Sequence, residues 1–337
     1  MKLRIFGESH APEIGVEIEG VPKGTAVDMG ELQAFLDRRA PGNGQGGMST
    51  PRKEPDRVVF ESGLEDPCAS LTSGEDTASP FCVATGGTIR AVIRNTNTRP
   101  QDYANVQTVP RPGHADYASW LQCGKIPTGG GKWSGRMTAP LCIAGGIALQ
   151  MLATKGVTIT SAVRRGGGDA AVPEGDSVGG VVEVVATGFP AGYGDVGTEG
   201  LESKLASAFF GIPAVKGVEF GAGFRLAEML GSKANDAFGI AGGEDCETKD
   251  GRRVRVSLRT NNCGGILGGV SVGMPIVARL AFKPTPSISL EQDSVDLVTM
   301  TPAKITVRGR HDRCVAFRGA VAAEAVMAVV LATEIFG

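Results

Sequence analysis

The sequence predicts a protein of the α+β class that consists of two similar halves, and three observations support this prediction. Segments in which apolar and polar residues alternate, as they do in half-buried strands, occur in both parts of the chain. In both parts a proline-containing turn follows such a segment, and a helix-like stretch comes next. Both parts then contain a histidine followed by a long apolar helix. Because alternating strands have one buried face, we expect mainly antiparallel sheets.

The first half supplies, in order, an alternating segment, a helix-like stretch, a second strand, a histidine and a long helix. These are residues 15–24, residues 29–37, residues 87–94, His114 and about residues 139–154. In the second half the same elements are residues 180–192, residues 201–209, residues 275–282, His311 and about residues 315–335.

This repeated order predicts an internal duplication within a single domain of residues 1–337, with halves of about 1–160 and 161–337. The alternative is that segments of similar composition resemble each other by chance. Fifty glycines recur in pairs and triplets beside apolar segments, which indicates tight turns and close backbone approach. Long loops, which in compact domains are commonly functional, are expected at residues 41–55, 96–128, 166–179 and 246–252.

The composition excludes several classes of protein. The net charge is −2, and no basic stripe indicates binding to nucleic acid. No stretch reaches the roughly 18 unbroken apolar residues of a membrane span, and the first residues lack the apolar core of a signal peptide. The seven cysteines are dispersed and odd in number, which argues against a zinc knuckle and a disulfide framework. We therefore expect a cytoplasmic protein with reduced thiols and no metal site.

The three histidines are the first candidates for catalysis because the chain has so few. His10, His114 and His311 all lie in polar, glycine-bearing segments with a carboxylate one or two residues away. A nearby carboxylate supports the protonated form of an imidazole, which suits a general acid at neutral pH. The competing interpretation is a hydrogen-bonded or exposed imidazole without a chemical role.

Two glycine-rich segments are candidates for ligand binding. Residues 129–138, GGGKWSGRMT, precede a predicted helix, so free backbone N–H groups and the helix N-terminus would favour an anion. This spacing is neither a Walker A loop nor a dinucleotide fingerprint, and a flexible capped turn explains it equally well. Residues 260–271 would let the backbone approach a flat ligand.

Cations accompany these segments. Residues 283–287, KPTPS, offer a lysine and hydroxyls for a phosphate or the edge of a flavin, although a proline-stiffened turn is the alternative. Arginine binds phosphate and carboxylate groups through two parallel hydrogen bonds. An anion pocket is therefore predicted from Arg38, Arg39, Arg52, Arg111, Arg136 and Arg310, although a solvated face is the alternative for the arginine pair.

Taken together, these motifs resemble those of the chorismate synthase family, in the family's order and over nearly the whole chain. The matching blocks are FGESHAPEIG, LDRRAPG, RKEPD, RPGHADY, GGGKWSGRMT, GDSVGG, IPAVKGVEFG, NNCGGILGG, KPTPSI and GRHDRC. The resemblance implies a β-α-β sandwich with an internal duplication, made of two four-stranded, mainly antiparallel sheets with helices. It also implies a homotetramer.

The resemblance further implies a carbon–oxygen lyase of the shikimate pathway, in aromatic amino-acid biosynthesis. Its expected reaction is the anti 1,4-elimination of phosphate from 5-enolpyruvylshikimate 3-phosphate, which gives chorismate. The reaction requires reduced FMN without net redox change, and whether NADPH reduces the FMN stays open. Two rivals remain: a flavin- or phosphometabolite-binding protein without catalysis, and a flavin reductase that consumes NADPH.

By motif, three residues are implied to be catalytic. His10 would be the acid near the leaving phosphate, His114 the acid near the flavin, and Asp312 the group that assists the flavin N5. The substrate and NADP side is implied to involve Arg39, Arg136 and Arg310. FMN contacts are implied at Lys132, Trp133, Ser134, Pro213, Ala214, Gly268, Lys283, Pro284, Thr285, Pro286, Ser287 and Arg310.

The chain also departs from the family's usual residues. Ala40 stands in place of a third arginine, and the next basic position of that loop falls near Gln45. Arg313 replaces a proline, and Pro213 an asparagine. Lys132 stands where the family commonly has Arg, Trp133 where it has Ser, and Met137 where it has Glu. We expect these changes to affect the affinity for FMN and substrate.

Overall fold

The computed structural model contains two four-stranded antiparallel sheets. It describes residues 1–41, 48–50, 55–65, 81–96, 106–166, 171–240, 246–307 and 311–337. The first sheet has the strand order β1 (Lys2–Gly7), β2 (Glu13–Glu19), β6 (Ile89–Arg94) and β4 (Val58–Ser62). The second has the order β7 (Thr158–Arg165), β8 (Gly180–Thr187), β16 (Ile276–Phe282) and β9 (Val215–Phe220).

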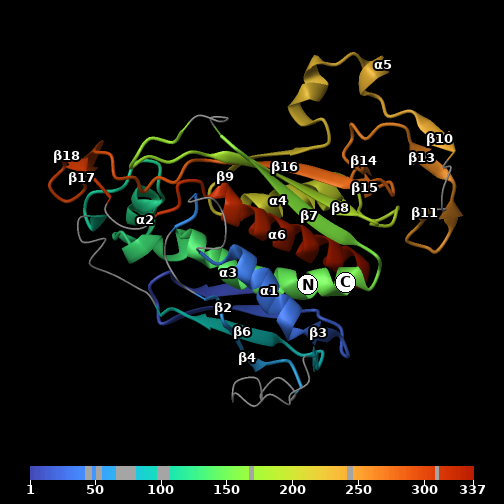
Figure 1. Cartoon of the computed structure of the whole chain (residues 1–337), viewed down its shortest axis with the longest axis horizontal. Helices are drawn as coiled ribbons and strands as arrows, with labels where there is room; N and C mark the ends of the chain where they lie inside the picture. The colour runs from blue at the N-terminus through green and yellow to red at the C-terminus, as the bar shows by residue number, and fades with distance from the viewer. Residues whose placement is uncertain are drawn as a thin grey trace.

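Helices lie between these sheets (Figure 1). They are α1 (Met29–Arg39), α3 (Thr138–Ala153), α6 (Ala316–Phe336) and α4 (Leu201–Phe210). Helix α3 packs on β2 and β6, α6 packs on β7 and β8, and the two helices pack closely on each other. The predicted mixture of helices with antiparallel, four-stranded sheets is confirmed.

The core fills the space between the sheets. Alternate residues of β2 and β16 point inward, so Ile14, Val16 and Leu280 are fully buried. A Cβ on Gly145 of α3 would lie 2.2 Å from the Cβ of Ala325 on α6. Only glycine therefore permits this close approach of the two helices. Both helices are apolar all round, as expected for helices buried on every side.

Two apolar helical stretches, Gly135–Ala153 and Ala316–Phe336, are long enough to cross a membrane by length and composition alone. Their most apolar windows are 78% and 72% buried inside the structure, respectively. Their hydrophobicity is thus explained by their position in the core.

The smaller elements lie around the edges of the two sheets. Helix α2 and the β17–β18 hairpin lie at one end of the molecule in Figure 1, and the ribbons β10–β13 and β11–β12 lie at the other. These elements are α2 (Asp116–Cys123), α5 (Gly231–Ala234), β3 (Ala26–Asp28), β5 (Phe81–Val83), β10 (Phe238–Ile240), β11 (Cys246–Glu247), β12 (Arg253–Val254), β13 (Val256–Leu258), β14 (Ile266–Leu267), β15 (Val270–Ser271), β17 (Gln292–Asp296) and β18 (Thr301–Ile305).

Three expectations from the sequence are wrong. The expected loop 96–128 contains α2, which ends at Gly124 in the left-handed conformation with φ of 66°, a signal of a helix end. The expected loop 246–252 begins with β11. Cys82 is disulfide-bonded, so the expectation of reduced thiols fails at this residue. The reason is that spacing along the chain does not reveal which thiols meet in space.

Candidate active site

A triple-glycine turn is the centre of the candidate site. Gly129, Gly130 and Gly131 have φ angles of 64°, 87° and 52°. A Cβ on Gly129 would lie 2.1 Å from Cε1 of His10, and one on Gly130 would lie 2.9 Å from Cε1 of His114. No side chain fits in either position, and the left-handed conformation itself disfavours residues other than glycine. The turn thus brings two of the three predicted catalytic side chains to neighbouring positions.

His10 lies in the loop that joins β1 to β2, and this loop is bonded to the glycine turn. The Ser9 hydroxyl donates to the carbonyl of Gly129 at 3.1 Å, and the Ser9 N–H donates to the carbonyl of Gly131 at 3.3 Å. The Ser9 hydroxyl also lies 3.3 Å from Nδ1 of His10. Backbone bonding of the preceding serine therefore fixes where the His10 ring lies.

His114 belongs to a buried ionic cluster at the start of α2. Its Nδ1 lies 2.6 Å from Oδ1 of Asp116. Arg111 donates from Nε to Oδ2 of Asp116 at 2.7 Å and from Nη2 to Oδ1 at 2.8 Å. The Arg111 and Asp116 side chains are 3% and 1% exposed. The carboxylate expected beside this histidine is thus present, two residues along the chain.

Burial and neighbouring charges set the protonation of this cluster. Burial lowers the pKa of His114, Asp116 opposes this effect, and the positive charges of Arg111 and Lys283 add to it, so the net direction is downward. Burial alone would raise the pKa of Asp116, but its hydrogen bonds to Arg111 and His114 outweigh burial and hold it far below its ordinary value. The expectation that a carboxylate makes this imidazole cationic is therefore wrong for His114.

A second buried cluster lies behind His10. Arg39 at the end of α1 donates from Nε to Oδ2 of Asp56 at 2.8 Å and from Nη1 to the Thr138 hydroxyl at 3.2 Å. Arg136 pairs with Oδ1 of the same carboxylate and donates from Nε to Oδ1 of Asn95 at 3.1 Å. Asp56 and Arg39 are completely buried. In this structure the Arg39 guanidinium therefore faces Asp56 and Thr138. The predicted contact of Arg39 with substrate would need the guanidinium to face an open surface.

Asp312, the third predicted catalytic residue, is connected to this cluster. It accepts from the Thr50 N–H at 2.9 Å and from Nη1 of Arg318 at 3.0 Å. Arg318 in turn donates from Nε to the carbonyl of Arg39 at 3.2 Å. A continuous series of hydrogen bonds thus leads from Asp312 through Arg39 to Asp56.

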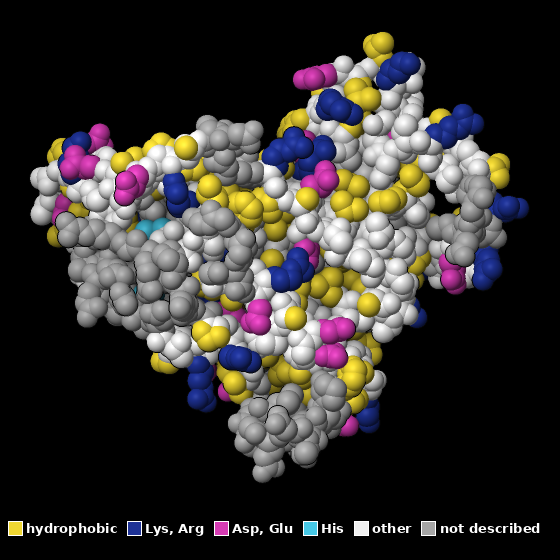
Figure 2. Space-filling model, in the orientation of Figure 1, with side chains coloured by type: hydrophobic (Ala, Val, Ile, Leu, Met, Phe, Trp, Pro, Cys, Tyr) yellow, Lys and Arg dark blue, Asp and Glu magenta, His cyan; other side chains and the backbone are white. Residues whose placement is uncertain are grey.

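The series continues to the loop that carries His10. Asn95, which accepts from Arg136, donates from Nδ2 to the carbonyl of Ala11 at 2.8 Å. The three predicted catalytic side chains therefore belong to one connected region. Along the chain, 104 residues separate His10 from His114, and 198 separate His114 from Asp312. In Figure 2, histidine atoms are visible on the side of the molecule where Figure 1 places α2.

Two of the segments predicted to bind FMN meet beside His114. The Lys283 N–H donates to the carbonyl of Ala214 at 3.0 Å, and the Lys283 ammonium donates to the carbonyl of Gly113. Arg111 donates from Nη1 to the Ser287 hydroxyl at 3.0 Å. Ala214 has a φ of 76°, an unusual angle for a residue with a side chain, which indicates local backbone strain.

The remaining predicted FMN contacts are distributed unevenly. The ammonium of Lys132 lies 4.6 Å from the ring centre of Trp133, and Ser134 accepts from the Arg136 N–H. Gly268 lies between β14 and β15, a hairpin on the opposite side of the molecule from α2 in Figure 1. The structure does not bring this hairpin to the histidines. Arg310 and Gln45 lie outside the described residues.

Sequence reasoning missed three residues of these clusters: Asp56, Asp116 as the partner of Arg111, and Arg318. The blocks RKEPD and RPGHADY contain two of them, but nothing in the local sequence marks a carboxylate as buried. A carboxylate with two cationic partners is recognisable only once the partners are adjacent in space.

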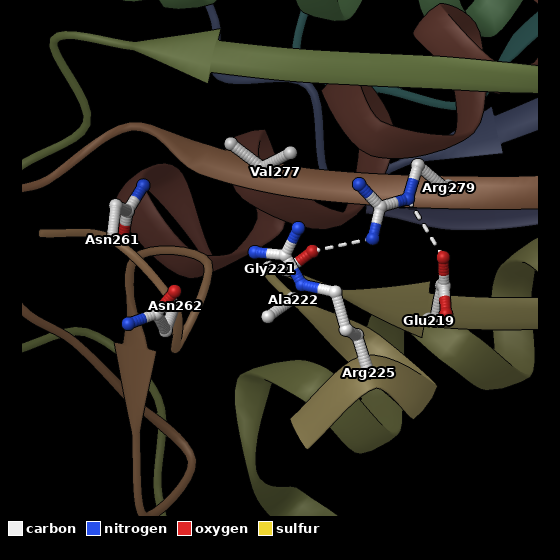
Figure 3. Close-up of a pocket in the computed structure, with 8 residues that line it drawn as sticks. All are labelled: Glu219, Gly221, Ala222, Arg225, Asn261, Asn262, Val277 and Arg279. Carbon is white, nitrogen blue, oxygen red and sulfur yellow. Dashed lines mark hydrogen bonds and ion pairs between the residues drawn. The ribbon is translucent and has the colours of Figure 1, made fainter. Parts of the chain in front are cut away.

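A separate pocket of about 520 Å³ opens on the outer face of the second sheet (Figure 3). Arg279 spans it, donating from Nε to Oε1 of Glu219 at 2.7 Å and from Nη2 to the carbonyl of Gly221 at 2.7 Å. Its other lining residues are Ala222, Arg225, Asn261, Asn262 and Val277. Asn261 and Asn262 belong to the glycine-rich segment 260–271 predicted to approach a flat ligand, whereas none of the described residues predicted by motif as catalytic or as FMN or substrate contacts lines this pocket.

The fold and the connected region define a class of protein: a mixed α and β protein with imidazoles, a carboxylate and arginines gathered around a glycine turn, as in enzymes that act on anionic substrates. The chain belongs to the chorismate synthase family, because the family's sequence profile, described as chorismate synthase, matches residues 1–174 and 168–336.

Individual relatives agree with this membership. A chorismate synthase from Lancefieldella parvula is 38% identical over 387 aligned positions, covering 100% of this chain and 94% of the relative. One from Thermococcus gammatolerans is 39% identical, covering 99% and 96%. A crystal structure of chorismate synthase superposes with a TM-score of 0.67 at 22% identity, covering 99% and 90%, which shows a shared fold.

Proposed function

We propose that this protein converts 5-enolpyruvylshikimate 3-phosphate to chorismate by anti 1,4-elimination of phosphate, as a carbon–oxygen lyase of the shikimate pathway. Family membership and one observation support the proposal: the triple-glycine turn places His10 and His114 at adjacent residues, Gly129 and Gly130. One imidazole for the departing phosphate and one beside the proposed flavin site suit a reaction in which a phosphate leaves and reduced FMN is required.

The residues near His114 fit reduced FMN. Left-handed glycines leave the backbone open to a planar ring, and Lys283 and Ser287 offer a cation and a hydroxyl beside Ala214. We assign FMN binding to Lys132 through Ser134, Pro213, Ala214 and Lys283 through Ser287. Reduced FMN, when bound, supplies the electron density that the departure of phosphate requires.

His10 is the proposed acid for the departing phosphate. Its Nδ1 lies 3.3 Å from the Ser9 hydroxyl, and we assign the proton transfer to Nε2. A proton placed on the phosphate oxygen offsets the negative charge that develops as the carbon–oxygen bond breaks. Asp312, held by Arg318 and the Thr50 N–H, is the proposed partner in removal of the ring proton.

The arginines have two proposed roles. Arg136 and Arg310 are assigned to the anionic groups of the substrate, where guanidinium groups stabilise developing charge. Arg39 is completely buried against Asp56, so we assign it to the support of Arg136 and not to direct contact.

The proposed architecture is the family's β-α-β sandwich with an internal duplication. In its support, Glu17 and Arg90 are opposite each other on β2 and β6, and Glu183 and Arg279 occupy the same relation on β8 and β16. We propose the homotetramer that the family resemblance implies, and the position of the β14–β15 hairpin on the opposite side of the molecule from α2 agrees with Gly268 serving a neighbouring subunit's site. We place the protein in the cytoplasm, without nucleic-acid or membrane partners.

An anaerobic phosphate-release assay with dithionite-reduced FMN tests the proposal. We expect release by the wild type and losses of about 10²-fold or more in His10→Ala, His114→Ala and Asp312→Asn, the range for general acid–base groups. Arg4→Gln, on the outer face of the first sheet, is the control.

Three outcomes would contradict the proposal. Variants as fast as the wild type would remove the assigned roles. FMN binding without phosphate release would favour a binding protein. Stoichiometric consumption of NADPH would indicate a flavin reductase.

A further inference from the structure

The cluster at the start of α2 determines which nitrogen of His114 carries the proton. Nδ1 lies 2.6 Å from Oδ1 of Asp116, a distance at which two lone pairs would repel each other. A proton must therefore lie between them. Burial alone would favour a neutral carboxyl, but the hydrogen bonds that Asp116 accepts from Arg111 and His114 outweigh burial and keep it ionised, so the proton belongs to the imidazole.

Arg111 fixes the orientation of Asp116 with three bonds. Its backbone N–H and its Nε both donate to Oδ2, at 3.0 and 2.7 Å, and Nη2 donates to Oδ1 at 2.8 Å. Of the two carboxylate oxygens only Oδ1 faces the His114 ring, at the shorter distance of 2.6 Å from Nδ1, and Arg111 Nη2 lies 3.1 Å from the same nitrogen. The carboxylate thus has one orientation, and it imposes one orientation on the imidazole.

The opposite edge of the ring faces the glycine turn. A Cβ on Gly130 would lie 3.0 Å from Nε2 of His114, so this nitrogen is directed toward the space that the missing side chain leaves open. The charged groups around the ring are Asp116, Arg111 and Lys283, and their net effect together with burial lowers the pKa of His114. At neutral pH the ring is neutral.

We propose, resting on the proposed function, that Arg111 and Asp116 are positioning residues that hold neutral His114 with its proton on Nδ1 and its Nε2 lone pair toward the glycine turn. In the ligand-free protein His114 is therefore a hydrogen-bond acceptor at Nε2. It becomes an acid only after it has taken a proton from solvent, which the arrival of an anionic ligand would favour.

Arg111 also links this arrangement to the flavin-binding segment. Its Nη1 donates to the Ser287 hydroxyl at 3.0 Å, across 176 residues of sequence. One guanidinium thereby fixes both the ring of His114 and the end of the segment 283–287. The two sides of the proposed FMN site cannot move independently while these bonds are intact.

Nitrogen-15 NMR of the full-length, ligand-free protein tests the tautomer directly. The chain has only three histidines, so His10→Gln and His311→Gln assign the His114 signals. At pH 7.5 we expect a protonated Nδ1 and an unprotonated Nε2. A wild-type signal with the proton on Nε2 would overturn the proposal without any variant.

Asp116→Asn is the decisive variant. The amide oxygen will take the Oδ2 position, where two Arg111 donors meet it, and the amide NH₂ will then face Nδ1 of His114. We expect the proton to move to Nε2, the kind of wrong tautomer that lowers kcat by about 10⁴ in a serine-protease triad with the equivalent change. Phosphate release should fall by roughly 10²–10⁴-fold through kcat, with KM for the substrate changed much less.

Ser287→Ala is the matched control for the tautomer. It removes the bond from Arg111 but leaves Asp116 and His114 in contact, so the proton should stay on Nδ1. An Asp116→Asn protein that folds, by circular dichroism, and keeps the wild-type tautomer would overturn the proposal. A wild type with the expected tautomer but no phosphate release would refute the proposed function and leave the positioning pair standing.

Discussion

Asp56 and Asp116 hold the two sides of the candidate site, and they differ in the partners that they bind. Each is almost completely buried and each accepts bonds from two basic side chains. The partners of Asp56 are two arginines, whose charge is permanent, whereas one partner of Asp116 is an imidazole. The charges of the Asp56 cluster therefore stay nearly constant with pH near neutrality. The Asp116 cluster, in contrast, contains a group that titrates in this range.

The pKa directions follow from these partners. Burial alone would raise the pKa of Asp56, but Arg39 and Arg136 outweigh burial and hold it below its ordinary value. The same balance lowers the pKa of Asp116. In the Asp116 cluster the pKa of a second group, His114, is also lowered, and this group titrates near neutrality.

The largest expected effect is on the Asp56 side. Asp56→Ala leaves Arg39 and Arg136 buried without their shared carboxylate, so we expect a loss of about 3–5 kcal/mol in the free energy of unfolding, as for a broken buried ion pair. Urea denaturation measures this loss. A loss below about 1 kcal/mol would mean that water or another group replaces Asp56 and that the cluster does not stabilise the fold.

The second effect distinguishes a displaced His10 ring from backbone strain at a left-handed glycine. Gly129→Ala puts a Cβ 2.1 Å from His10 at a φ of 64°, whereas Gly124→Ala, at a φ of 66°, has open space around its Cβ. Both variants should lose about 1–2 kcal/mol of stability from the left-handed conformation. Only Gly129→Ala should also lose phosphate release, by about 10²-fold. Equal activity in the two variants would show that the position of His10 does not matter.

The third effect is the dependence of stability on pH. The folded-state pKa of His114 lies below its unfolded value of about 6.5, so the unfolded chain binds more protons and stability falls as the pH drops below that value. The slope from this one group is at most about 1.4 kcal/mol per pH unit. Asp56 and Asp116, with lowered pKa values, lose their contribution only as the pH falls below about 4.

Urea denaturation of the wild type and His114→Gln between pH 7.5 and 5 measures this slope. The variant should lack the part of the slope that His114 contributes, and Asp56→Ala should retain it. An identical slope in the wild type and His114→Gln would show that His114 titrates alike in the folded and unfolded chain.

The smallest effect lies outside both clusters. Arg4 pairs with Glu17 at 2.6 Å on the outer face of the first sheet, with its side chain 71% exposed. Exposed ion pairs contribute little because water screens them. Arg4→Gln should therefore leave both the unfolding midpoint and phosphate release at wild-type values. A clear drop in either would mean that this face is covered in the assembled protein.

The sequence predicted the long helices and the main strands well because local patterns determine them. Residues 29–37 and 201–209 were expected as helices and lie in α1 and α4, and residues 275–282 include β16. It did not predict α2, a short helix whose buried residues, Asp116 and Ser119, are polar, because nothing in the local sequence marks polar residues as buried. Nor did it predict that Arg39 is completely buried against Asp56, because burial of a charged side chain is a property of the packed fold.

The amino-acid sequence by itself determined the family, the periodicity of strands and helices, and the positions of His10, His114 and Asp312 in glycine-bearing loops. Only the tertiary structure decided which groups share Asp56 and Asp116, which nitrogen of His114 faces Asp116, and that neighbouring glycines contact two histidines. The reason is physical: Asp56 meets Arg136 across 80 residues, and such meetings depend on how sheets and helices pack, not on spacing along the chain.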